Sequence, residues 1–192
     1  NKVEGETLPI WDYKSQEKGD AVQRITAGEA VEKGYFKNKA YAWTVVLAYK
    51  LFRNMGIIDD NIRLRQHFPD EKAFYADDAW DVEISTKSFG WIEACGVHDR
   101  TDYDLKQHAK FSGTPLEAHD EATGQKFIPH VLEIEFGTDR PVFTLLDNFY
   151  DQKIKDEGKT VLKLPYHMSP MPVAVFPLMK KPELVAKATA IH

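Results

Sequence analysis

Residues 127–150 read FIPHVLEIEFGTDRPVFTLLDNFY, and this segment decides the expected fold. Its first half alternates between apolar and polar residues, as a half-buried β-strand does. The apolar residues share one face, and Val131, Glu133 and Glu135 share the other. Gly137 then ends the strand. The pattern therefore predicts a strand that presents two carboxylates on the same face.

A helix is expected directly after this strand. Thr138 stands where a cap would, and Pro141 falls in the first turn, where its missing N–H costs nothing. Arg140 occupies the same turn although a cation there opposes the helix dipole, so a further partner must favour it. The partner is either a bound anion or a neighbouring acid such as Asp139 or Asp147, and the pattern leaves both open. The expected apolar stripe of this helix comprises Val142, Leu145, Leu146 and Phe149.

Two helices are expected upstream. Thr26 and Glu29 match a capping box, which predicts a short helix that ends near Gly34. A longer helix is expected from about residue 37 to residue 54, with Gly56 placed to end it. Its expected buried stripe is Ala40, Trp43, Leu47 and Leu51.

After residue 60 the hydrophobic period becomes two, which predicts strands. Arg63 and Arg65 alternate with apolar residues. They form either a basic binding face or surface ion pairs with the acids of residues 70–81, and such pairs contribute under ~1 kcal/mol each. Residues 81–85 and 89–96 are expected to pair as an antiparallel hairpin.

The second strand of that hairpin carries another carboxylate of interest. Regular alternation places Glu93 on one face together with Phe89, Trp91 and Cys95. We therefore expect Glu93 to be partly buried, and a buried carboxylate needs hydrogen-bond donors or a cationic or hydroxyl-bearing ligand.

Arg100 stands where this strand meets a helix expected over about residues 98–111. At such a junction the guanidinium either reaches over the sheet to hold a carboxylate or pairs with Asp102 or Asp104. The neighbouring His98 and Asp99 are not expected to act as a catalytic pair, because adjacent residues on a turn rarely face each other.

The C-terminal part is expected to begin a second domain. Prolines punctuate a linker after residue 164, so the predicted domains are residues 1–164 and 165–192. Short strands are expected over residues 161–164 and 173–176, followed by an amphipathic helix over 181–191. The expected fold class is α+β, with an antiparallel sheet flanked by helices and the start of an α/β domain.

Composition excludes several classes of protein. The chain has 192 residues, 43% of them apolar, and a formal net charge of −5, so it lacks the overall positive charge that would indicate a nucleic-acid partner. The single cysteine rules out an internal disulfide, and seven scattered histidines lack the spacing of a metal site. No apolar run approaches the ~20 residues of a membrane span, and no signal peptide opens the chain. We therefore expect a soluble cytoplasmic protein with no membrane partner and no structural metal.

Several segments, in order along the chain, resemble the glycyl-tRNA synthetases of the dimeric class II type. They are ITAGEAVEKG (25–34), RLRQH (63–67), YADDAWD (75–81), FGWIE (89–93), DRTDYDL (99–105) and PHVLEIEFGTDR (129–140). The last resembles motif 3 of class II synthetases, placed at 129–150, and residues 161–191 resemble the start of the family's anticodon-binding domain.

The resemblance implies a site on one face of an antiparallel sheet. By resemblance, Glu93 and Arg140 are catalytic, and ATP is bound by Glu93, Ala94, Gly137, Thr138, Asp139 and Arg140. Glycine is bound by Arg100, Glu133, Glu135 and Gly137. The implied reaction activates glycine with ATP and Mg²⁺ to an adenylate and then transfers it to tRNA(Gly), in a homodimeric protein. A cation on the phosphates and a carboxylate on the ammonium suit that chemistry.

Two departures from the family pattern qualify this interpretation. Glu135 stands where the family has a serine, which places a longer anion at the glycine pocket. The chain begins with Asn1 and, by resemblance, after motifs 1 and 2, so we expect a fragment that cannot aminoacylate alone. The alternative is a non-catalytic synthetase-like protein, similar to polymerase accessory subunits, that binds nucleic acid or a partner.

Overall fold

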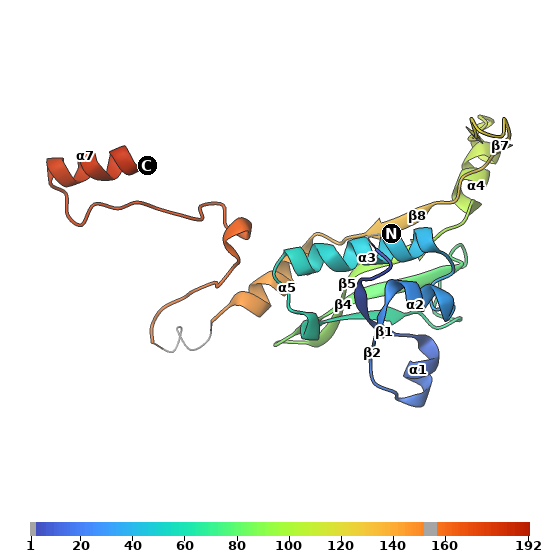
Figure 1. The fold of residues 1–192 in the computed structure, drawn as a ribbon, viewed down its shortest axis with the longest axis horizontal. Coiled ribbons are helices and arrows are strands. Elements are labelled where there is room, and N and C mark those ends of the chain that lie inside the picture. Colours follow the sequence, from blue (N-terminus) through green and yellow to red (C-terminus); the bar gives the residue numbers. More distant parts are fainter. Residues whose placement is uncertain (1–2, 152–156) are drawn as a thin grey trace. The chain divides into compact units, whose positions relative to one another are not determined.

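The computed structural model describes residues 3–151 and 157–192. The chain divides into two compact units, Asn1–Tyr150 and Asp151–His192. The first unit contains a sheet flanked by helices (Figure 1). This architecture confirms the expected α+β class. The boundary expected after residue 164 falls inside the second unit and stays a prediction.

One six-stranded sheet organises the first unit, in the order β2-β1-β3-β4-β5-β8. Only β1 and β3 are parallel neighbours, and every other pair is antiparallel. The strands are β1 Thr7–Trp11, β2 Gln23–Thr26, β3 Ile62–Gln66, β4 Asp78–Thr86, β5 Gly90–Asp99 and β8 Leu132–Glu135. The expected hairpin (β4 and β5) and the expected strand before Gly137 (β8) are thus both confirmed.

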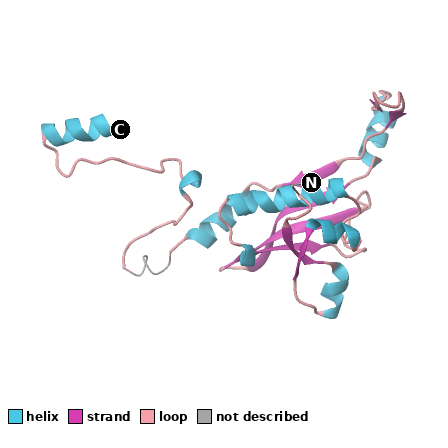
Figure 2. Ribbon diagram, in the orientation of Figure 1, coloured by secondary structure: helices cyan, strands magenta, loops and turns pink. Residues whose placement is uncertain are grey.

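Helices α2 (Ala27–Glu32) and α3 (Lys39–Asn54) contribute to the core on one face of this sheet (Figure 2). The capping box at α2 is present: Thr26 and Glu29 each accept from the other's backbone N–H.

The buried stripe predicted for α3 was wrong. Trp43 is 52% exposed, and the buried residues are Tyr41, Ala42, Thr44, Val45, Val46, Ala48, Tyr49 and Phe52. The helix is apolar around most of its circumference, so periodicity alone does not single out one face.

The remaining elements surround the sheet. They are α1 Tyr13–Lys18, the 3-10 turn Asp59–Asn61, α4 Tyr103–Ser112, the hairpin of β6 Ala118–His119 and β7 Lys126–Phe127, and α5 Asp139–Phe149. The β6–β7 hairpin was not predicted.

Helix α5 follows β8 as expected, but two details of the prediction were wrong. Thr138 precedes the helix, yet it has helical backbone angles and its side chain makes no capping hydrogen bond. Of the predicted stripe, Leu145 and Phe149 pack against the core, whereas Val142 and Leu146 are exposed. Thr144 is fully buried instead, and its hydroxyl is satisfied because it donates to the Pro141 carbonyl.

The second unit contains the 3-10 turn Tyr166–Met168 and helix α7, Pro182–Ile191. The helix was expected. Neither strand expected over 161–164 and 173–176 forms: the first segment has only an isolated β-bridge at Leu162, and in the second Val173 and Phe176 are about 80% exposed. A strand needs a partner for its backbone groups, and within 157–192 the structure offers no sheet. Among the described residues, no helix is both long and apolar enough to traverse a bilayer.

Candidate functional site

The sheet face opposite the apolar core carries charged side chains from four strands. Directly paired residues in neighbouring strands share a face, so the register defines three rows across the sheet. These rows are Arg63, Glu83 and Glu93; Arg65, Asp81, Gly96 and Glu135; and Ala79, His98 and Glu133. We call this surface the polar face.

A β-bulge in β5 sets which residues reach the polar face. Val82 pairs with Cys95 and Glu83 pairs with Glu93, so Ala94 has no partner in β4. Ala94 and Cys95 are each 1% exposed and both belong to the core. The prediction that Glu93 and Cys95 share a face was therefore wrong, because regular alternation fails at this extra residue.

Glu93 and Arg140, the predicted catalytic pair, lie together at the edge of the polar face. The Arg140 guanidinium is 2.9 Å from the Glu93 carboxylate and also donates to the Glu93 carbonyl at 3.2 Å. Both side chains are about half exposed, so Glu93 is more open than expected. Arg140 thus has an acidic partner in this structure, although it is neither Asp139 nor Asp147.

Arg100 and Glu133, both predicted to bind glycine, also meet. Arg100 donates to both carboxylate oxygens of Glu133 at 2.9 and 3.1 Å, and its remaining nitrogens hold Asp104. Its guanidinium lies 4.0 Å from the ring centre of Tyr75. His98 Nδ1 is 2.9 Å from Glu133. Burial acts to raise the pKa of Glu133, but the hydrogen bonds from His98 and Arg100 prevail and lower it.

Arg63 is enclosed by aromatic rings. Its guanidinium lies 4.2 Å from the Trp11 ring centre and 4.5 Å from that of Trp91, and it pairs with Glu83. The Arg63 and Glu83 side chains are only 17% and 12% exposed. The alternative of exposed surface pairs is thus wrong for Arg63, because its partner lies in the adjacent strand, both side chains are largely buried, and two rings cover the guanidinium.

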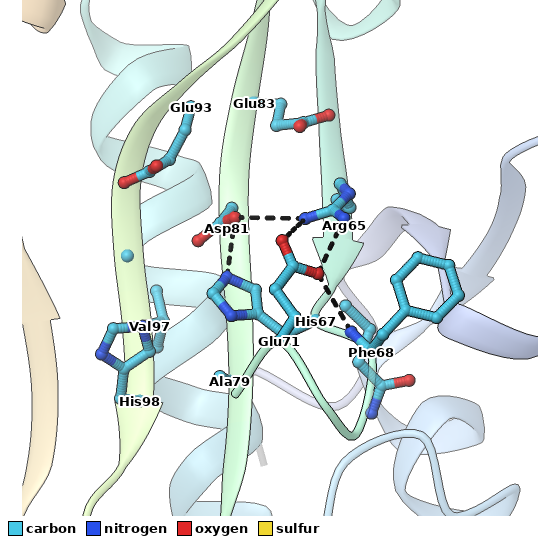
Figure 3. A network of polar contacts seen from close by, with 12 residues as sticks. Arg65, His67, Phe68, Glu71, Ala79, Asp81, Glu83, Glu93, Val97 and His98 are labelled. Atoms are coloured by element: carbon cyan, nitrogen blue, oxygen red, sulfur yellow. Dashed lines mark hydrogen bonds and ion pairs between the residues drawn. The ribbon is translucent and has the colours of Figure 1, made fainter. Parts of the chain in front are cut away.

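Arg65 and His67 share a network around Asp81 (Figure 3). Arg65 holds Glu71 through two nitrogens at 2.8 and 2.9 Å, and it lies 3.7 Å from Asp81. His67 Nε2 is 2.8 Å from Asp81. Burial acts to lower the pKa of His67, yet the hydrogen bond and charge of Asp81 raise it overall. His67 Nδ1 is buried and has no hydrogen-bond partner within the described part of the chain.

The other predicted residues occupy different positions. Glu135 lies on the polar face, opposite Gly96, and is exposed. Gly137, Thr138 and Asp139 form the link from β8 to α5, next to Arg140. The side chain of Ala94 lies in the core, as described above.

His98 and Asp81 were not predicted as site residues. The bulge at Ala94 places His98 on the polar face, and no local sequence pattern indicates this bulge. Arg65 pairs with Glu71 and Asp81, as the ion-pair alternative for the acids of residues 70–81 expected. Two groups of side chains on this face bring ligand-type atoms within 4.8 Å of one another: His67, Asp81 and His98, and His98, Glu133 and Glu135. Histidines scattered in the sequence thus converge in the fold.

Comparison with known proteins identifies relatives of the chain. No protein-family model matches it. The whole chain aligns with curated glycine–tRNA ligases: 30% identity with that of Pyrococcus horikoshii, 29% with that of Pyrococcus furiosus and 29% with that of Methanothermobacter thermautotrophicus. In each case it covers about 46% or 47% of the relative, so the chain spans about half the length of the proteins it matches.

These relatives confirm the resemblance inferred from the sequence. The match with the Pyrococcus horikoshii protein runs over 267 positions, whereas this chain has 192 residues. The relative therefore has residues within the matched stretch that have no counterpart here. The chain is a relative of glycine–tRNA ligases in which part of that stretch is shortened.

Proposed function

We propose that this chain forms the substrate-binding face of a glycine–tRNA ligase. The observation that carries the proposal is the joint placement of Arg140 with Glu93 and of Arg100 with Glu133 on one sheet face. The alignment of the whole chain with glycine–tRNA ligases supports it.

The Arg140 end of the face suits a nucleotide. Arg140 is 54% exposed and its present partner is a half-exposed carboxylate, so the pair contributes little and can open at small cost. The guanidinium is then free to hold phosphate oxygens bidentately. As glycine attacks the α-phosphate, this cation would stabilise the charge that develops there.

The Glu133 end suits the amino acid. The Glu133 carboxylate is held by Arg100 and His98, and its pKa is lowered, so it stays charged at neutral pH and can receive an ammonium group. Arg100 is fixed by Asp104 and by the Tyr75 ring, which keeps its position while a carboxylate binds nearby. Glu135, two residues away on the same face, adds negative charge beside Glu133.

Mg²⁺ and ATP fit the same surface. Magnesium prefers oxygen ligands and keeps several waters, and Glu93 offers an exposed carboxylate beside Arg140. When bound, the ion would offset phosphate charge. Transfer of glycine to tRNA(Gly), a homodimeric assembly and a cytoplasmic location belong to the same proposal for the whole protein.

Glycine-dependent ATP–pyrophosphate exchange tests this function. The protein containing this chain at full length should catalyse exchange with glycine but not with alanine or serine. Arg140→Ala should reduce the rate about 10²-fold or more, the typical effect of losing one donor to a developing anion. Arg24→Ala, which removes an exposed pair with Asp60, is the matched control and should leave exchange unchanged.

The 192-residue chain alone is expected to show no exchange. Absence of exchange by the full-length protein with all three amino acids would refute the proposal. That result would favour the non-catalytic, synthetase-like alternative.

A further inference from the structure

We propose that His67, Asp81 and His98 form a binding site for a divalent transition metal ion of the zinc type. The three side chains come from the end of β3, from β4 and from β5, and they meet on the polar face (Figure 3). Their ligand atoms lie within 4.8 Å of one another, with His67 Nε2 at 2.8 Å from Asp81. The ring centres of the two histidines are 5.9 Å apart.

The carboxylate that contacts His98 supports a metal-binding role. Its Nδ1 lies 2.9 Å from Glu133, and an ionised carboxylate can only accept, so Nδ1 carries the proton. The lone pair is therefore on Nε2. Metal-bound histidines usually donate their other N–H to a carboxylate in this manner, which fixes the ring orientation. Arg100 in turn holds Glu133, so the outer shell of this ligand is already assembled.

Gly96 lets the His98 ring approach Asp81. It lies between Asp81 and Glu135 in the same row, and a Cβ at this position would come within 3.2 Å of His98 Cε1 and Nε2. The missing side chain therefore allows the imidazole to lie over this row with its Nε2 lone pair beside the carboxylates.

Asp81 accepts from His67 Nε2 at 2.8 Å and lies 3.7 Å from Arg65, whose two terminal nitrogens are engaged by Glu71. An ion between Asp81 and His67 would take the place of the proton that Nε2 now donates, so both side chains would stay paired through the ion. The buried Nδ1 of His67 has no partner in the described residues, so this ring is incompletely satisfied by hydrogen bonds.

The required rearrangement is small. Zinc bonds of ~2.0–2.2 Å in tetrahedral geometry place ligand atoms about 3.4 Å apart. The present separations range from 2.8 Å to at most 4.8 Å, so side-chain rotations of about an ångström suffice. Three protein ligands leave a fourth position for water or for Glu135. Two imidazoles select Zn²⁺ or Co²⁺ over Mg²⁺, so this site differs chemically from one for the magnesium of ATP.

Titration of the 192-residue chain with Co²⁺ and Zn²⁺ tests the site directly. We expect one ion per chain, visible d–d absorption bands of tetrahedral cobalt, and displacement of cobalt by zinc but not by excess Mg²⁺. His98→Ala should abolish the bands. Glu133→Gln should weaken binding about 10–100-fold, the usual effect of removing a carboxylate that orients a metal-bound histidine.

His119→Ala, at an exposed histidine of β6, is the matched control and should bind as the parent does. Circular dichroism of each variant checks that it is folded, and His98→Gln provides a second substitution that retains polarity. No bound ion in the parent, or undiminished binding in folded His98→Ala and His98→Gln, would overturn the proposal. Neither readout requires pyrophosphate exchange, so the two proposals can fail independently.

Discussion

The hydroxyl of Tyr41 joins helix α3 to the strand that bears His98, and its removal should destabilise the first unit measurably. Tyr41 is fully buried and donates to the Val97 carbonyl at 2.6 Å. Burial raises its pKa well above the ordinary value, so the hydroxyl remains a neutral donor throughout the accessible pH range. Tyr41→Phe keeps the ring, including its edge contact with Phe36, and removes only this bond.

The expected loss follows from these contacts. Removing one partner of a buried hydrogen bond costs about 1–3 kcal/mol. For a unit of this size each kcal/mol lowers Tm by roughly 2–4 °C, so we expect a fall of about 2–12 °C. Urea unfolding followed by circular dichroism measures the free energy, and hydrogen exchange should show faster opening at Val97 and His98.

Tyr103→Phe is the control, since the Tyr103 hydroxyl makes no hydrogen bond within residues 3–151 and 157–192 and its side chain is 36% exposed. A loss below ~0.5 kcal/mol for Tyr41→Phe, or one equal to the control, would show that the Tyr41 bond does not stabilise the sheet.

Three further predictions concern separate parts of the chain. Thr26→Ala should lower the unfolding free energy by about 1 kcal/mol because the Thr26–Glu29 capping box is lost, whereas exposed Thr114→Ala should change it little; equal effects would exclude the cap. Cys95 is 1% exposed and burial raises its pKa to about 12, so a thiol reagent at pH 8 should label it only in urea; rapid labelling without urea would contradict its burial. A protein truncated after Tyr150 should unfold with the same urea midpoint as the whole chain, and a lower midpoint would mean that residues 151–192 stabilise the first unit.

The parts of the fold set by near neighbours could be predicted from the sequence. The strand, glycine break and helix of residues 127–150 depend on successive residues, and so does the capping box at Thr26. The placement of Glu93 and Arg140 at one site, and of Arg100 and Glu133 at another, was expected only through the family resemblance, because 47 and 33 residues separate the partners.

Predictions that depended on an element's surroundings were less successful. Periodicity in α3 placed Trp43 in the buried stripe, whereas Tyr41 and Phe52 are the residues that pack in the core. The helix has several apolar stripes, and the position of the sheet decides which of them is buried. The segment 173–176 has the composition of a buried strand, but it has no neighbouring strand with which to pair in residues 157–192. The composition of a segment gives only its tendency to form a strand, and a neighbouring strand with which to pair decides whether one forms.

The bulge at Ala94 illustrates how one residue can decide the chemistry of a surface. Without it, strict alternation from Glu93 would place Cys95 and Val97 on the polar face and turn Gly96 and His98 toward the core. With it, Gly96 lies opposite Asp81 and leaves room for the His98 ring, and His98 meets Glu133. The extra residue itself is buried and chemically inert. Both the pocket proposed for glycine and the proposed metal site therefore depend on a residue that can contact neither ligand through its side chain.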